Sequence, residues 1–199
     1  SHRAGHVYGI NTKAMELAGI DRDTPDPPGG RYGRDPATGD LDGVIYERAS
    51  DPIRENLLPG VTAADRRAGL RRINGMLTKV GLTSVHDARV TNEELITYQE
   101  GRDNGELDLR VYMLMAHPHF PALKDAGLKT GFGDDMLRLG GIKMVADGAI
   151  ATRTAFLSEP YEGSEDEHGI LAMSAAEIEP LVMDIHQAGF QVCIHANGD

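Results

Sequence analysis

The chain contains one cysteine, Cys193, among its 199 residues. This scarcity excludes a framework of internal disulfides and any zinc or iron–sulfur site built from several cysteines. Cys193 lies within the apolar stretch 190–194, where we expect it to be a small residue of the core. No run of about 18 apolar residues occurs either, so the sequence predicts no membrane span.

The chain also has few basic residues: it contains 20 Lys and Arg residues against 31 Asp and Glu residues, so its formal net charge is −11 at pH 7. Such a balance argues against nucleic acid or an anionic membrane surface as a partner. The first residues, 1–5, do not have the character of a signal peptide, and we expect a cytoplasmic protein. The sequence leaves homo-oligomerisation open.

A glycine-rich phosphate fingerprint is missing after each predicted strand, which weakens the case for a nucleotide-binding open sheet. From Thr62 onward, strand and helix patterns alternate. The predicted strands are 82–88, 109–116, 139–147 and 190–195, and the predicted helices begin near residues 62, 91, 121 and 174. This alternation predicts an α/β fold with a parallel sheet covered by helices, either an open doubly wound sheet or part of a (β/α)8 TIM barrel. Four strands would make about half of such a barrel.

Residues 1–60 have a different texture, rich in Gly, Pro and Asp. A short helix is predicted over 11–18, and strands at 31–35 and 41–47 flank a turn. We therefore predict a small insertion or lid subdomain at 1–60 and a partial barrel at 61–199. The connection 148–173 is unusually long and follows a strand end, which is typical of a functional loop.

Lys143 is the sharpest internal signal. Strand alternation places Lys143 and Asp147 on one face and Ile142 and Met144 on the other. In a barrel the apolar face meets the helices, so Lys143 would point inward. A buried lysine tends to lose its proton, and the neutral amine can form a Schiff base or take up carbon dioxide as a carbamate that bridges metal ions. A buried ion pair between Lys143 and Asp147 explains the pattern equally well.

His195 follows the last apolar strand and precedes Ala196-Asn197-Gly198-Asp199. A histidine at the carboxyl end of a buried strand is how a parallel barrel presents a metal ligand or a catalytic base. Neighbouring strands would bring Lys143 and His195 to one mouth of the barrel. Because the chain stops on this strand, we expect it to be part of a longer enzyme.

Several motifs resemble one family in the same order along the chain. The segment 140–148, followed by Arg153-Thr154-Ala155, resembles the Lys-x-x-x-Asp-Gly … Arg-Thr-Ala segment of the amidohydrolase superfamily, in the branch of the N-substituted formamide deformylases. Residues 195–199 resemble its His-Ala-x-Gly-Asp motif, and Gly5-His6 and the segment 81–88 resemble further stretches. The resemblance implies a (β/α)8 barrel, of which this chain would supply about strands two to five.

The resemblance also implies a reaction, the hydrolysis of an amide-like C–N bond in a small molecule by metal-activated water. Lys143, as the free amine or as a carbamate, and His195 would bind one or two divalent ions, which we expect to be zinc, and the other ligands would lie outside this chain. His6, Asp147 and Arg153 would line the substrate site, and no catalytic acid or base is identified. Two alternatives stay open: a Schiff-base lyase or aldolase that uses Lys143, and a binding or regulatory barrel without catalysis.

Overall fold

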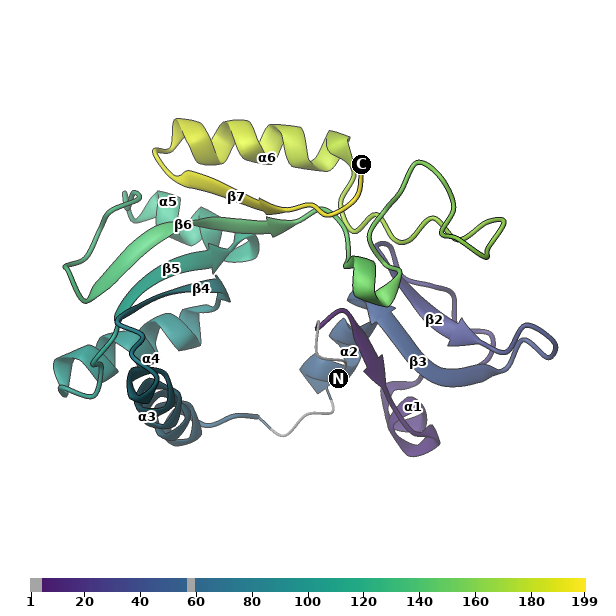
Figure 1. Ribbon diagram of the computed structural model, residues 1–199, viewed down its shortest axis with the longest axis horizontal. Helices are drawn as coiled ribbons and strands as arrows, with labels where there is room; N and C mark the ends of the chain where they lie inside the picture. Colours follow the sequence, from purple (N-terminus) through teal and green to yellow (C-terminus); the bar gives the residue numbers. More distant parts are fainter. Residues whose placement is uncertain (1–4, 57–59) are drawn as a thin grey trace. The chain divides into compact units, whose positions relative to one another are not determined.

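The computed structural model describes residues 5–56 and 60–199, which form two compact units (Figure 1). The N-terminal unit combines the start of the chain with Val145–Ile178 and His195–Asp199, and the sheet unit contains Gly60–Met144 and Glu179–Ile194. The predicted division into domains 1–60 and 61–199 stays a prediction.

The sheet unit is built on a four-stranded sheet with the order β4-β5-β6-β7. Its strands are β4 (Ser84–Val90), β5 (Arg110–Ala116), β6 (Leu137–Val145) and β7 (Gln191–His195). Strand β5 pairs in parallel with both β4 and β6, as the alternating pattern predicted. The expected parallel α/β arrangement is therefore confirmed.

Helices connect these strands and lie along one side of the sheet in Figure 1. They are α3 (Ala63–Lys79), α4 (Asn92–Asp103), α5 (Phe120–Asp125) and α6 (Ala175–Gln187). Capping boxes open α3 at Thr62 and α4 at Thr91, where each threonine hydroxyl accepts a backbone N–H and an acidic side chain three residues later accepts the N–H of the threonine. These signals were readable in the sequence, and both predicted helix starts are confirmed.

Alternating side chains bury one face of the sheet. Val111, Met113 and Met115 of β5 are at most 3% exposed, and Ile142 and Met144 of β6 are completely buried. The side chain between the last two, that of Lys143, is only half-buried, in agreement with the predicted alternation.

Strand β6 ends at Val145, two residues before its predicted end, so Asp147 lies beyond the strand. The physical reason is at Ala146, whose carbonyl oxygen accepts the N–H groups of Ala172 and Met173 from the long connection. The chain therefore turns from the sheet towards the connection before it reaches Asp147. The alternation that grouped Lys143 with Asp147 does not extend that far.

Two glycines shape β6 just before Lys143. The register between β5 and β6 shifts at this point, as in a β-bulge. A Cβ atom on Gly140 would lie 2.2 Å from the Tyr112 ring, and one on Gly141 would lie 2.6 Å from the carbonyl oxygen of Gln191. Only glycine lets these neighbours approach the strand so closely.

The N-terminal unit contains a three-stranded antiparallel sheet with the order β1-β3-β2. Its elements are β1 (Val7–Gly9), α1 (Thr12–Ala18), β2 (Gly30–Arg34), β3 (Leu41–Glu47) and α2 (Asp51–Asn56). The predicted hairpin and helix are confirmed, with Asn11 capping α1 and Gly19 in the left-handed conformation after it. Strand β1 and helix α2 were not predicted, because segments this short carry no periodic signal.

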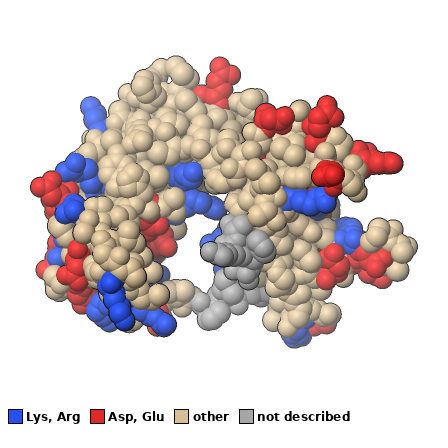
Figure 2. All heavy atoms as spheres, in the orientation of Figure 1, with Lys and Arg blue, Asp and Glu red and all other residues tan. Residues whose placement is uncertain are grey.

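The acidic surplus of the sequence is distributed over the surface. Figure 2 shows acidic and basic side chains interspersed on the visible face. The structure over 5–56 and 60–199 contains no helix that is both long and apolar enough to cross a membrane.

The buried face of the sheet yields a stability prediction. Replacing Ile142 with alanine should lower the free energy of unfolding by about 2–5 kcal/mol, because a fully buried side chain leaves a cavity. Urea unfolding followed by circular dichroism measures the change. Ile73→Ala is the matched control, since Ile73 is 45% exposed and should lose much less. Equal losses in the two variants would contradict the assigned packing.

Candidate active site

The buried carboxylate of Asp147 ties two segments of the N-terminal unit together. The residue is 3% exposed. Its Oδ1 accepts the N–H of Asn197 at 2.9 Å, and its Oδ2 accepts the N–H groups of Phe156 at 2.9 Å and Gly198 at 2.7 Å. A buried carboxylate is tolerated when its oxygens are satisfied in this way. Asp147 therefore holds the segment after β7 against the long connection.

His195 stands at the end of β7 with one ring nitrogen engaged. Its Nε2 lies 2.9 Å from the carbonyl oxygen of Gly148 and 3.1 Å from Nδ2 of Asn197, and that Nδ2 also donates to the Gly148 oxygen at 3.0 Å. Nε2 of His195 thus faces an acceptor, the Gly148 oxygen, and a donor, the Asn197 amide, and the tautomer decides which contact is its hydrogen bond. In the tautomer with the proton on Nε2, which bonds to Gly148, the lone pair of His195 is on Nδ1.

A second histidine and a carboxylate adjoin His195. Nδ1 of His6 lies 2.8 Å from Oε2 of Glu47, and the two side chains are 17% and 7% exposed. The His6 ring stacks on the His195 ring, with 5.3 Å between centroids and 25° between planes. We call His6, Glu47, Gly148 and His195 the histidine cluster.

Sequence reasoning missed Glu47, which was read only as the last residue of a strand. The rule that singled out His195 applies to the carboxyl ends of parallel strands, whereas β3 is antiparallel, so no signal in the sequence pointed to Glu47.

Lys143 belongs to the sheet unit, where its backbone is in register with Ala116 of β5. Burial lowers the pKa of the Lys143 amine. The nearby Cys193 acts in the opposite direction, and the positive charge of Arg89 lowers the pKa further. The direction agrees with the prediction of a lysine that loses its proton readily.

Arg153 is held by the long connection itself. It adopts a left-handed conformation, with φ at 55°, after the short helical turn η3 (Ile150–Thr152). Its guanidinium lies 5.2 Å from the centre of the Tyr161 ring and donates to the carbonyl oxygen of Glu162 at 3.2 Å. Of the predicted site residues, the N-terminal unit thus contains His6, Asp147, Arg153 and His195, and its hydrogen bonds join the surroundings of Asp147 and His195 through Asn197.

Within the part of the chain that the structure describes, no group of three or more His, Cys, Asp or Glu side chains is placed to hold a metal ion.

A sequence profile described as the Amidohydrolase family matches residues 1–199. The chain belongs to the amidohydrolase family. The resemblance read from the motifs around Lys143 and His195 is thereby confirmed.

Three similar proteins place this amidohydrolase among its relatives. The protein YtcJ of Bacillus subtilis (strain 168) is 28% identical over 199 residues, which covers 98% of this chain and 37% of YtcJ. The N-substituted formamide deformylase of Arthrobacter pascens is 25% identical over 203 residues, which covers 98% of this chain and 37% of that enzyme. The crystal structure of an uncharacterized metal-dependent hydrolase from Pyrococcus horikoshii OT3 matches with a TM-score of 0.72 at 28% identity, covering 98% of this chain and 38% of that one. The chain thus spans well under half the length of the relatives it matches.

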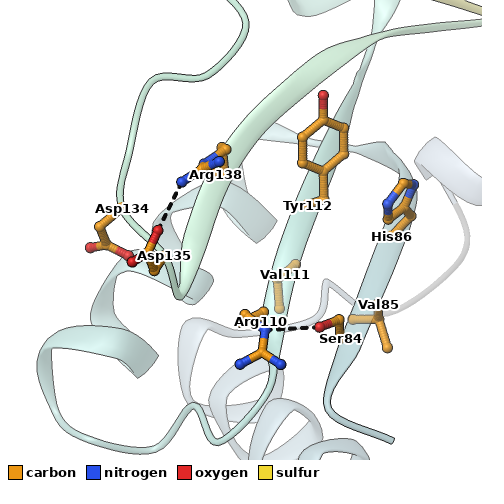
Figure 3. Close-up of a pocket in the computed structure, with 9 residues that line it drawn as sticks. All are labelled: Ser84, Val85, His86, Arg110, Val111, Tyr112, Asp134, Asp135 and Arg138. Carbon is orange, nitrogen blue, oxygen red and sulfur yellow. Dashed lines mark hydrogen bonds and ion pairs between the residues drawn. The ribbon is translucent and has the colours of Figure 1, made fainter.

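A pocket of about 370 Å³ lies at the amino ends of strands β4 and β5 (Figure 3). It is bordered by the first residues of β4 and β5, where Arg110 donates to the hydroxyl of Ser84 at 2.9 Å, and the His86 ring lies 4.8 Å from the Tyr112 ring. Parallel α/β proteins bind their ligands at the carboxyl ends of the strands. This pocket at the amino ends is therefore not the candidate active site of the amidohydrolase.

The clamp at Asp147 yields a second prediction. In Asp147→Asn, an NH2 group would replace one acceptor oxygen and would face a backbone N–H, which is also a donor. The free energy of unfolding should therefore fall by about 1–3 kcal/mol. Asp199→Asn is the control, because that exposed carboxylate binds only the backbone and hydroxyl of Ser158 and should matter less. Chemical denaturation measures the free energy of unfolding of both variants. A larger loss in Asp199→Asn than in Asp147→Asn would contradict the role assigned to Asp147.

Asp87, which follows His86 in β4, yields a prediction about pH. Burial raises the pKa of Asp87, whose Oδ2 accepts the hydroxyl of Tyr98 at 2.6 Å. A raised pKa means that the stability contribution is full below the ordinary value of about 3.9 and is lost as the pH rises through the folded-state value. Asp87→Asn, which keeps an acceptor for Tyr98, should therefore be at least as stable as wild type at pH 7. Thermal melts at pH 7 and pH 3.5 should show this advantage vanish in acid, and a constant difference would contradict it.

Proposed function

We propose that this chain supplies part of the active site of a metal-dependent amidohydrolase that hydrolyses an amide-like C–N bond in a small molecule. We further propose that β4 to β7 are about strands two to five of a (β/α)8 barrel. The observation that carries the proposal is the contact between His195 Nε2 and the carbonyl oxygen of Gly148 in a member of the amidohydrolase family: with the proton on Nε2, the lone pair of the ring would be on Nδ1. The deformylase among the relatives supports a C–N bond as the target.

The geometry of His195 suits a metal ligand. Metal-binding histidines nearly always donate their second ring N–H to a carbonyl or carboxylate, which fixes the tautomer and the ring orientation. The carbonyl of Gly148 has this role, and no hydrogen bond occupies Nδ1 within the described residues. His195 would therefore bind the ion through Nδ1.

Lys143 suits the second ligand in a modified form. Burial favours its neutral amine, whose nitrogen can attack the carbon of carbon dioxide and release a proton to solvent. The product is a carbamate, an anionic oxygen donor. Together with a histidine nitrogen, such a ligand suits zinc.

When bound, a divalent ion lowers the pKa of water and polarises the carbonyl group that is attacked. The chain's own side chains would bind and orient the substrate. His6 lies beside His195 and would contact the substrate, and Arg153 would offer guanidinium donors to a substrate oxygen. Asp147 would hold the backbone that surrounds them.

The family resemblance implies further metal ligands, and the described residues contain no group of three or more His, Cys, Asp or Glu side chains placed to hold an ion. We propose that these further ligands lie in the rest of a protein as long as the relatives, of which this chain spans 37% in YtcJ. A cytoplasmic location and homo-oligomerisation stay predictions.

The Schiff-base alternative draws on the same observation at Lys143, since an amine whose pKa is lowered by partial burial is also a candidate nucleophile for carbonyl compounds. Membership of the amidohydrolase family favours the hydrolase. Trapping of a carbonyl substrate on Lys143 by borohydride would reverse this preference.

Metal content tests the proposed function in the protein expressed from its complete gene. His195→Asn and Lys143→Met should each weaken zinc binding by more than about 100-fold, because the loss of mere second-shell partners already costs about 10–100-fold. Elemental analysis after dialysis and competition with a chelator measure the affinity, and hydrolysis of an N-substituted formamide measures the activity.

His168→Asn is the matched control. That histidine lies in the long connection, binds the carbonyl oxygen of Leu157 through Nδ1 and should not affect the metal. If the wild-type protein binds no metal, or if either site variant retains it, the assignment fails.

A further inference from the structure

Glu47 has a backbone conformation that its residue type disfavours. It ends β3 with φ at 50° and ψ at −129°, one of three non-glycine residues with positive φ within 5–56 and 60–199. Strained residues of this kind persist where the surrounding structure imposes them, and they concentrate at functional sites.

Only one of the two carboxylate oxygens of Glu47 has a hydrogen-bond partner within the described residues. Its side chain is 7% exposed, and Oε2 accepts only from Nδ1 of His6, at 2.8 Å. Oε1 is buried and has no hydrogen-bond partner within the described residues. A buried carboxylate oxygen without a hydrogen bond lowers the stability of the fold, and so does a strained backbone. A role for Glu47 in stability alone therefore does not explain the arrangement.

The surroundings of Glu47 hold it against both histidines. Its N–H donates to the carbonyl oxygen of His6 at 2.9 Å, so that backbone and side chain together grip the same residue. On the other side, a Cβ atom on Gly148 would lie 2.3 Å from Oε1. The absence of a side chain at Gly148 therefore lets the carboxylate approach the residue whose carbonyl orients His195.

We propose that Glu47 is a positioning residue that holds His6 in the tautomer with the proton on Nδ1. An ionised carboxylate only accepts, so it selects this tautomer and leaves the lone pair on Nε2. No hydrogen bond occupies that nitrogen within the described residues. His6 then presents an acceptor beside His195, suited to the N–H of a secondary amide substrate. This inference rests on the proposed function and narrows its substrate class to amides that carry an N–H.

The tautomer can be measured on this chain directly. Long-range proton–nitrogen correlation spectra of ¹⁵N-histidine-labelled protein distinguish the two neutral forms, and the spectrum of His6→Asn assigns the His6 signal. Wild type should show the proton on Nδ1. Glu47→Met should lose this preference, whereas Glu47→Gln, which keeps an acceptor oxygen, should retain it at least in part.

Glu167→Met is the matched control for these spectra. Glu167 pairs with Arg31 in the same unit at 3.0 Å, so its loss removes a partly buried carboxylate elsewhere. The His6 signal should not change. A wild-type proton on Nε2, or an unchanged His6 tautomer in a folded Glu47→Met, overturns the positioning role. If Glu47→Met does not fold, the wild-type spectrum decides, because a proton on Nε2 of His6 overturns the role by itself and a proton on Nδ1 supports it.

A kinetic comparison tests the substrate class in the protein expressed from its complete gene. Glu47→Met should raise KM for N-butylformamide about tenfold more than it raises KM for butyl formate, which lacks the N–H, because only the amide loses a hydrogen bond. Equal effects on the amide and the ester would show a merely structural role and overturn the proposal.

The metal content of the wild-type protein distinguishes a failure of the proposed hydrolase function from a failure of the inference about Glu47. A wild-type protein without metal would refute the hydrolase and with it the substrate class, while the spectra would still decide whether Glu47 sets the tautomer. A wild-type protein with metal whose Glu47 variants behave alike on both substrates would refute only the inference about Glu47.

Discussion

The arrangement of the candidate site depends on one carboxylate, that of Asp147. Its two oxygens accept three backbone N–H groups, from Phe156, Asn197 and Gly198, and so join the start of the long connection to the segment after β7. These amides would otherwise be partly buried without partners, which is costly. The position of Gly148, the next residue, follows from this clamp.

Different parts of the Gly148 backbone contact His195 and leave room for Glu47. Its carbonyl oxygen accepts from His195 and Asn197, and the space beside its Cα admits the carboxylate of Glu47. A larger residue at position 148 would push the carboxylate of Glu47 away from this backbone even if every hydrogen-bonding group were kept. The Asp-Gly pair of the motif therefore has two distinct physical roles: charge in the first residue and absence of a side chain in the second.

Sequence patterns predicted the elements whose stability is local. The capping boxes at Thr62 and Thr91 and the alternation through Ile142 and Met144 each have their cause within a few residues, and the structure agrees with them. Strand β1 escaped prediction because its pairing with β3 bridges residues far apart in the sequence. Glu47 escaped because its unusual φ is imposed by tertiary contacts that no residue propensity records.

The predicted site residues owe their environments to different forces. The half-buried position of Lys143 follows from apolar packing of β6, since the neighbouring Ile142 and Met144 anchor the strand and leave the amine in a setting that disfavours its charge. The state of His195 follows instead from a directional network of hydrogen bonds around Gly148. Apolar packing tolerates exchanges of similar volume, whereas a hydrogen-bonded network fails when one partner is lost. Sequence divergence among relatives should therefore be freer in the core beneath Lys143 than at Asp147, Gly148 and Asn197, because the latter residues make the hydrogen bonds that surround the His195 ring.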